Sequence, residues 1–159
     1  MKSEKVLELQ RRMHQFIVGK RVEVENIHIT LSFLGERNEE EIKRIIERLR
    51  RLSSSSLKRD AILTRVKLIP NERYIRVVAI EVVGIDDLVD TIKKEIGGDV
   101  KPPHLTLFRV KEVRNREALL KLTEEEINEH IFVDKICLVK STLTFDGPIY
   151  EIIESFELS

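Results

Sequence analysis

The chain has 159 residues, and its 42% hydrophobic and 35% charged residues are typical of one soluble globular domain, which excludes a disordered segment. Its 28 Lys and Arg residues equal its 28 Asp and Glu residues, which excludes a uniformly basic surface for duplex nucleic acid but leaves room for a local basic cleft. The single cysteine excludes an intramolecular disulfide and is typical of the reducing cytoplasm, and no apolar run approaches the roughly 20 residues of a membrane span.

The beginning of the sequence predicts a helix followed by a strand. Apolar residues at helical spacing predict the helix over residues 4–13, with the sequence EKVLELQRRM. Alternation of polar and apolar residues predicts the strand over residues 22–34. We expect His28 and Thr30 on one face of this strand and apolar residues, Phe33 among them, on the other.

A second helix is predicted after a break at Gly35. The segment NEEEIKRIIERLRRL is amphipathic, with Asn38 as its N-cap and acidic residues in its first turn. The four serines from Ser53 to Ser56 predict a polar loop after this helix, too short to be a domain linker.

The rest of the sequence alternates irregularly between helices and strands. The predicted strands cover residues 61–69, 74–83, 104–110, 132–140 and 149–158, and the predicted helices cover residues 86–96 and 115–129. A Pro-Asn turn at Pro70 joins the first two of these strands into a hairpin. Joins of hairpin length favour an α+β fold with antiparallel sheets over a doubly wound parallel sheet.

Two of the four histidines occur in near-identical strand contexts. One segment reads NIHITLSFLG and the other PPHLTLFRV, and in each the histidine is followed by an apolar residue, a threonine and a leucine. Residues two apart project from the same face of a strand, so His28 points with Thr30, and His104 points with Thr106. For either segment alone, a half-buried histidine beside a strand-forming threonine is an equally good interpretation.

Together, the two segments predict phosphodiester chemistry. Imidazole changes its charge near neutral pH, so one ring can act as a base while the other acts as an acid. Threonine hydroxyls can donate to the non-bridging oxygens of a phosphate. This combination suits in-line attack of water on a phosphodiester, and it uses neither a nucleophilic side chain nor a metal.

These residues resemble the 2H phosphoesterases, and most closely the bacterial and archaeal RNA 2′,3′-cyclic phosphodiesterases, also called 2′-5′ RNA ligase-like proteins. The two His-apolar-Thr segments match the signature of that family. IPNERYIRVVAI resembles its central hairpin, and KSTLTFDGPIYEIIESFEL resembles its C-terminal pair of strands. The resemblance covers nearly the whole chain, from about Glu4 to Leu158.

The resemblance implies roles for individual residues. It implies that His104 is the base that activates water, that His28 is the acid that protonates the departing 3′ oxygen, and that the two threonines hold the phosphoryl oxygens. Arg109 matches an arginine that follows the second signature, although strict alternation would turn it away from the site unless a bulge or the end of the strand intervenes. Tyr74 and Arg76 share a strand face, and the resemblance implies that they line the nucleotide side of the site.

We therefore expect an α+β fold of two pseudo-symmetric lobes of antiparallel sheet with outer helices around a central cleft, in a single bilobed domain over residues 1–159. Each lobe is expected to supply one His-x-Thr strand. The resemblance implies hydrolysis of RNA 2′,3′-cyclic phosphate ends without metal or other cofactor. One alternative is 2′-5′ RNA ligation on tRNA halves, and another is a non-catalytic protein that binds RNA ends. The expected partner is RNA, tRNA fragments included, for a cytoplasmic monomer with no membrane contact.

Overall fold

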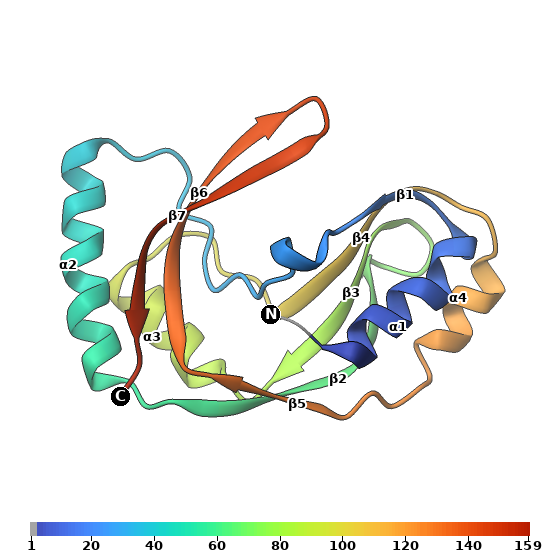
Figure 1. The fold of residues 1–159 in the computed structure, drawn as a ribbon, viewed down its shortest axis with the longest axis horizontal. Helices are drawn as coiled ribbons and strands as arrows, with labels where there is room; N and C mark the ends of the chain where they lie inside the picture. The colour runs from blue at the N-terminus through green and yellow to red at the C-terminus, as the bar shows by residue number, and fades with distance from the viewer. Residues whose placement is uncertain (1–2) are drawn as a thin grey trace. The chain divides into compact units, whose positions relative to one another are not determined.

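A computed structural model of the protein describes residues 3–159 and shows a mixed chain of helices and antiparallel strands (Figure 1). Its contacts divide the chain into two compact units, and each unit is assembled from three separate stretches of sequence. The first unit comprises the chain up to Thr30, Ala61–Val83 and Pro102–Ile131, and the second comprises Leu31–Asp60, Gly84–Lys101 and Phe132–Ser159. The predicted α+β organisation with antiparallel pairing is confirmed.

A five-stranded sheet forms most of the first unit, with the strand order β1-β4-β3-β2-β5 (Figure 1). Its strands are β1 (Ile17–Arg21), β2 (Arg59–Pro70), β3 (Ile75–Val83), β4 (His104–Val113) and β5 (Glu129–Val133). The pairs β1–β4, β3–β4 and β2–β3 are all antiparallel, and β2 and β3 form the predicted hairpin. Because β4 lies between β1 and β3, both of its edges are occupied along most of its length.

The apolar face of this sheet and two helices supply the core of the first unit. Helix α1 (Glu4–Met13) has the predicted bounds, and it buries Val6, Leu9 and Met13 because these residues recur at helical spacing. Helix α4 (Arg116–Leu122) is shorter than predicted. Three consecutive glutamates follow Thr123, and negative charge is unfavourable at the negative end of a helix dipole, which accounts for the early end.

The prediction of one continuous strand over residues 22–34 is wrong. The chain runs along β4 as β1, makes a short 3₁₀ helix at Val24–Asn26, and then touches β4 again through a single bridge at Ile29. Phe33 makes an isolated bridge elsewhere and is 55% exposed, so it does not face the core as expected. The edge of β4 is therefore covered by one interrupted strand.

The second unit combines two helices with a two-stranded ribbon. Helix α2 spans Glu39–Ser55, α3 spans Asp86–Glu95, and the ribbon pairs β6 (Lys135–Thr144) with β7 (Gly147–Glu157). Both helices and the ribbon contribute to one buried cluster, whose members are Ile45, Leu49, Leu52, Leu88, Ile92, Ile136, Leu138, Phe156 and Leu158. No helix among the described residues is long and apolar enough to cross a membrane.

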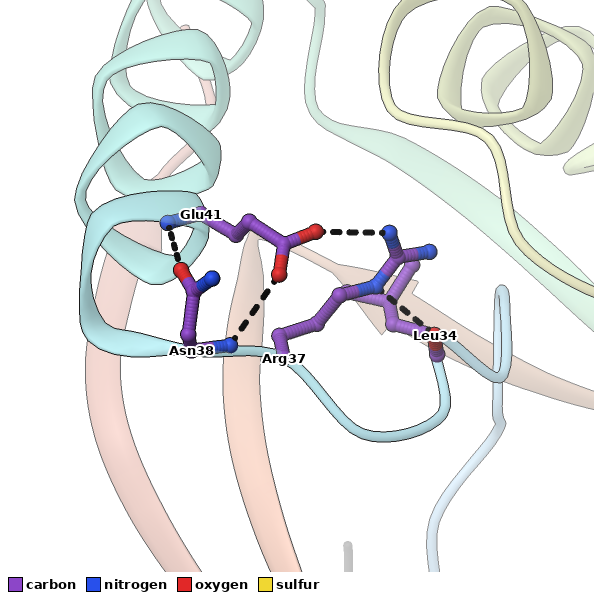
Figure 2. Close-up of polar contacts among 4 residues, drawn as sticks. All are labelled: Leu34, Arg37, Asn38 and Glu41. Carbon is purple, nitrogen blue, oxygen red and sulfur yellow. Dashed lines mark hydrogen bonds and ion pairs between the residues drawn. The ribbon is translucent and has the colours of Figure 1, made fainter.

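The start of α2 is fixed by reciprocal hydrogen bonds, as Figure 2 shows. The backbone nitrogen of Glu41 donates to Oδ1 of Asn38 at 2.9 Å, and the backbone nitrogen of Asn38 donates to Oε1 of Glu41 at 3.2 Å. Arg37 donates to Oε2 of the same glutamate at 3.4 Å and to the carbonyl of Leu34 at 2.9 Å. The backbone N–H of Asn38, followed by the Arg37 side chain, lowers the pKa of Glu41 below its usual value. The predicted N-cap at Asn38 is confirmed.

The predicted serine loop is wrong, because α2 continues through Ser55. The serine hydroxyls donate back to carbonyl oxygens of the preceding turn instead of leaving the helix. Ser53 donates to Arg50 at 3.0 Å, and Ser56 donates to Leu52 at 2.7 Å. These local bonds satisfy the last carbonyls of the helix, so the polar run caps α2.

Candidate active site

The two His-x-Thr segments lie side by side at one edge of β4. Ile29 and Leu105 form an antiparallel bridge. In an antiparallel pair, the residue before one partner lies opposite the residue after the other. The resulting opposite pairs are His28 with Thr106 and Thr30 with His104. Each histidine is therefore next to the threonine of the other segment.

Both segments belong to the first compact unit, which corrects the expectation that each lobe supplies one of them. The physical reason is that the interrupted strand and β4 pair directly through their backbones. Leu105 also pairs with Ile80 of β3, and both side chains are fully buried. The central apolar residue of the second segment thus anchors it in the core, while the polar residues on either side face outward.

The sheet geometry sets the spacing of the four polar side chains. Directly opposite residues have Cβ atoms about 5 Å apart, and diagonal neighbours are about 7–8 Å apart. His28 and His104 are diagonal neighbours in this register, as are the two threonines. His28 is exposed and the other three residues are half-buried, so the group is open to solvent.

The two imidazole rings are held in the same way. Nδ1 of His28 lies 2.6 Å from the backbone oxygen of Asn26, and Nδ1 of His104 lies 2.8 Å from the backbone oxygen of Pro102. A carbonyl oxygen only accepts hydrogen bonds, so each Nδ1 must carry the proton and donate. Nε2 of each ring is therefore the atom whose protonation can change.

Arg109 lies on the same face of the sheet as Thr106 because β4 contains a bulge. Their partners on β3 are Val77 and Ala79, which are two residues apart and therefore project from the same face. The register shifts between these pairs, so β4 has one extra residue, Leu107. Arg109 needs a bulge or a strand end to reach the site, as the sequence predicted, and the structure has the bulge.

Two further residues, neither of which was predicted from the sequence, support the bulge. The side-chain amide of Gln10, which is only 2% exposed, donates to the carbonyl oxygens of Val22 at 3.0 Å and Leu107 at 3.2 Å. Gly19 lies against the carbonyl of Arg109 so closely that a Cβ at this position would overlap that oxygen. Helix α1 and strand β1 thus hold the backbone on either side of the arginine.

Tyr74 and Arg76 lie together at the beginning of β3. The guanidinium of Arg76 donates to the hydroxyl of Tyr74 at 2.8 Å and lies 5.3 Å from the centre of its ring. Arg76 also lines a surface depression to which Arg109 contributes. The tyrosine is 59% exposed, so its ring offers a surface for stacking.

An acidic residue that was not predicted as part of the site lies opposite His104. Glu81 of β3 pairs with His104 in the sheet register. Its carboxylate accepts a hydrogen bond from the hydroxyl of Thr64 at 2.7 Å and lies 3.7 Å from Nζ of Lys67. The polar residue in an otherwise apolar strand, VVAIEVV, was the sequence signal for it. Within residues 3–159, no group of three or more His, Cys, Asp or Glu side chains is arranged to hold a metal ion.

Comparison of the sequence with known families matches residues 1–79 to the family described as LigT-like phosphoesterase. The RNA 2′,3′-cyclic phosphodiesterase of Methanocaldococcus jannaschii is 36% identical, over 86% of this chain and 83% of the relative. Proteins of the same name are 32% identical in Aquifex aeolicus, over 89% of this chain and 83% of the relative, and 35% identical in Methanothermobacter thermautotrophicus, over 87% and 82%.

Solved structures have the same fold. The crystal structure of TT0787 of Thermus thermophilus matches with a TM-score of 0.84 and 26% identity, over 96% of this chain and 89% of that one. Escherichia coli LigT, in a crystal structure with ATP, matches with a TM-score of 0.74 over 100% of this chain and 93% of that one. At 20% identity, this second match supports the fold alone.

Proposed function

The chain belongs to the LigT-like phosphoesterase family, and we propose that it hydrolyses RNA 2′,3′-cyclic phosphate ends to 2′-phosphomonoesters. The relatives in Methanocaldococcus jannaschii and Aquifex aeolicus are named RNA 2′,3′-cyclic phosphodiesterases, which supports this substrate. The observation that carries the proposal is the bridge between Ile29 and Leu105, which sets two histidines diagonally across one small patch of sheet.

In the proposed mechanism, His104 and His28 act on opposite sides of the phosphorus. Nε2 of His104 takes a proton from water as the water oxygen attacks the phosphorus. The bond from phosphorus to the 3′ oxygen breaks, and Nε2 of His28 gives its proton to that oxygen. The products are a 2′-phosphate and a free 3′ hydroxyl. Nδ1 of each ring lies against a backbone carbonyl, so this contact does not distinguish base from acid, and their order rests on the family resemblance.

The backbone carbonyls of Asn26 and Pro102 make this proton transfer efficient. Each carbonyl keeps the proton on Nδ1 of its ring through the whole cycle, so only Nε2 gains or loses one. The same bond fixes the ring orientation. A ring that cannot rotate presents Nε2 to the reacting oxygen without further loss of entropy.

The negative charge that develops on the phosphate is stabilised by Thr30, Thr106 and Arg109. The threonine hydroxyls donate to the non-bridging oxygens, and the guanidinium adds positive charge on the same face of the sheet. Tyr74 and Arg76 contact the nucleotide by stacking and by phosphate attraction. With these groups the proposed reaction proceeds without a metal.

All the proposed site residues come from one unit of one chain, so a monomer is sufficient for the reaction. We propose RNA as the partner, with tRNA fragments among its substrates and the cytoplasm as its location. Such fragments can end in the cyclic phosphate that this chemistry consumes. The exposed and polar surroundings of the site suit a charged substrate that remains partly in solvent.

Product analysis on a short RNA that ends in a cyclic phosphate tests the function directly. We expect an RNA with a 2′-phosphate end, formed by the wild type but not by His28→Ala or His104→Ala. We expect the same rate in the presence of EDTA, because no step uses a metal. A joined strand as the main product would instead indicate a ligase, and tight binding without turnover would indicate a non-catalytic RNA-end-binding protein.

A further inference from the structure

A basic depression extends from Arg109 at the edge of the sheet. It has a volume of about 470 Å³, and seven residues line it: Val18, Gly19, Lys20, Arg76, Arg109, Val110 and Lys111. Four of these residues are positively charged and none is acidic. Positive charges gathered in one depression produce a local positive potential that attracts anions.

The charge around this depression differs from that of the chain as a whole. The chain has zero net charge, so four cations around one depression are a local departure from its average. Elsewhere on the first unit the two signs are mixed, as in the ion pairs of Arg12 with Glu125 and of Lys67 with Glu81. This local excess of positive charge indicates an anion-binding surface.

The position of this depression relates it to the candidate active site. Along β4 the order is His104, Thr106, Arg109 and Lys111, so the depression lies beyond Arg109 as seen from the histidines. Lys20 pairs with Arg109 in the register of β1 and β4, and the two side chains therefore share a face. The row that contains Arg109 is about 7 Å from the row that contains Thr106, because the two rows are two residues apart on β3.

The chemistry of a cyclic end defines what can occupy the depression. The 2′ and 3′ oxygens of the last nucleotide are both bonded to the cyclic phosphate, so the RNA can continue only from its 5′ oxygen. The next anion along the substrate is therefore the phosphodiester that joins the last nucleotide to the preceding one.

We propose that the depression binds this preceding phosphodiester, and that the enzyme consequently prefers oligonucleotides to cyclic mononucleotides. The inference rests on the proposed function and deepens it, because it assigns the substrate class and the direction in which the RNA leaves the site. Lys20 and Lys111 supply positive charge there. Tyr74, which accepts a hydrogen bond from Arg76, offers a neighbouring ring on which a base can stack.

The test compares two substrates that share the same reacting end. One is a nucleoside 2′,3′-cyclic phosphate, and the other is a trinucleotide that ends in the same cyclic nucleotide. We expect the wild type to have the higher kcat/KM on the trinucleotide. Lys20→Gln and Lys111→Gln each lower the ratio of the two kcat/KM values by about three- to tenfold, mainly through KM. Lys94→Gln, which removes an exposed charge from α3 in the other unit, leaves the ratio unchanged.

Two outcomes overturn the inference. If the Lys20→Gln/Lys111→Gln double variant keeps the wild-type ratio, the depression does not bind the preceding phosphodiester. If the double variant loses the same factor on both substrates, the lysines act on the reacting end instead.

A separate measurement distinguishes failure of the inference from failure of the proposed function. If the wild type hydrolyses neither substrate, the proposed function fails. Fluorescence anisotropy with a labelled trinucleotide that ends in a 2′-phosphate then measures RNA binding without turnover, and comparison of the double variant with the wild type isolates the contribution of the depression. We expect the double variant to bind it more weakly and with a smaller dependence on salt, and unchanged affinity overturns the inference.

Discussion

Ile29 and Leu105 form a single antiparallel bridge, and this contact brings the two His-x-Thr segments into register. Because the segments run in opposite directions, they are related by a local two-fold axis. A two-fold arrangement suits in-line substitution at phosphorus, in which one group enters as another leaves on the opposite side. We propose that the repeated motif reflects the symmetry of this reaction, in which each histidine acts beside the other segment's threonine.

Replacing either histidine by alanine should abolish turnover. We expect His28→Ala and His104→Ala each to lower kcat by about 10²–10⁴-fold, because each variant loses one proton-transfer group. The far-ultraviolet circular dichroism should stay that of the wild type, since neither ring is part of the core. His14→Ala and His130→Ala are matched controls, because both histidines are exposed and outside the site. Full activity in either site variant would contradict the paired mechanism.

The rate should depend on pH through both rings. The proposed reaction requires one neutral and one protonated imidazole, so a plot of kcat/KM from about pH 5 to 9 should be bell-shaped. In the His104→Ala variant, the base is missing. Any residual activity should therefore give a pH profile without the limb that depends on the base. A profile that is flat over the whole range would be incompatible with acid and base catalysis by two histidines.

The hydroxyl groups of Thr30 and Thr106 should contribute more to the rate than the branched shape of these side chains. Thr30→Val and Thr106→Val preserve the branched side chain but remove the donor, and we expect each to lower kcat by about 10²-fold. Thr30→Ser and Thr106→Ser restore the hydroxyl and should recover most of the rate. If the serine variants are as slow as the valine variants, the methyl groups rather than the hydroxyls are important.

Much of the site and of the surrounding fold follows from local sequence patterns. The alternation rule identifies the outward faces of His28 and His104, and the capping pattern at Asn38 predicts the start of α2. The pairing of Ile29 with Leu105 could not be predicted from these local patterns, because it joins distant segments and depends on the whole sheet.

The bulge had a signal of its own that alternation alone overlooks. Leu107 and Phe108 are adjacent apolar residues in a strand that otherwise alternates, and both are buried. A regular strand cannot bury two neighbours on one face, so such a pair indicates an extra residue. The supporting bonds from Gln10 could not be predicted, because they join α1 to a carbonyl far along the chain.

Gln10 should act on catalysis through Arg109. Gln10→Met leaves the buried carbonyls of Val22 and Leu107 with one donor fewer, and we expect it to lower the free energy of unfolding by about 1–3 kcal/mol in urea denaturation. We also expect kcat/KM to fall, because the bulge that orients Arg109 is released. In an Arg109→Ala background, the substitution should still destabilise the protein but cause no further loss of activity. Additive losses of activity would show that Gln10 acts by another route.

The capping box of α2 should make stability depend on pH. Asn38→Ala removes the side-chain acceptor and should lower the free energy of unfolding by about 1 kcal/mol at pH 7. For Glu41, the folded protein has a lowered pKa, so its carboxylate stabilises the fold above the ordinary value of 4.5. This contribution is lost as the pH falls through the lowered pKa.

Glu41→Gln should therefore be less stable than the wild type at pH 7, and the difference should shrink towards zero as the pH falls below the pKa that Glu41 has in the fold. Glu40→Gln is the matched control, because it also removes a negative charge from the first turn of α2 but has no role in the capping box. Both variants lose the favourable interaction with the helix dipole, so the excess loss in Glu41→Gln reports the contacts of the Glu41 carboxylate with the backbone of Asn38 and with Arg37. Equal losses in the two variants at pH 7, measured by urea denaturation, would assign the effect to the dipole alone.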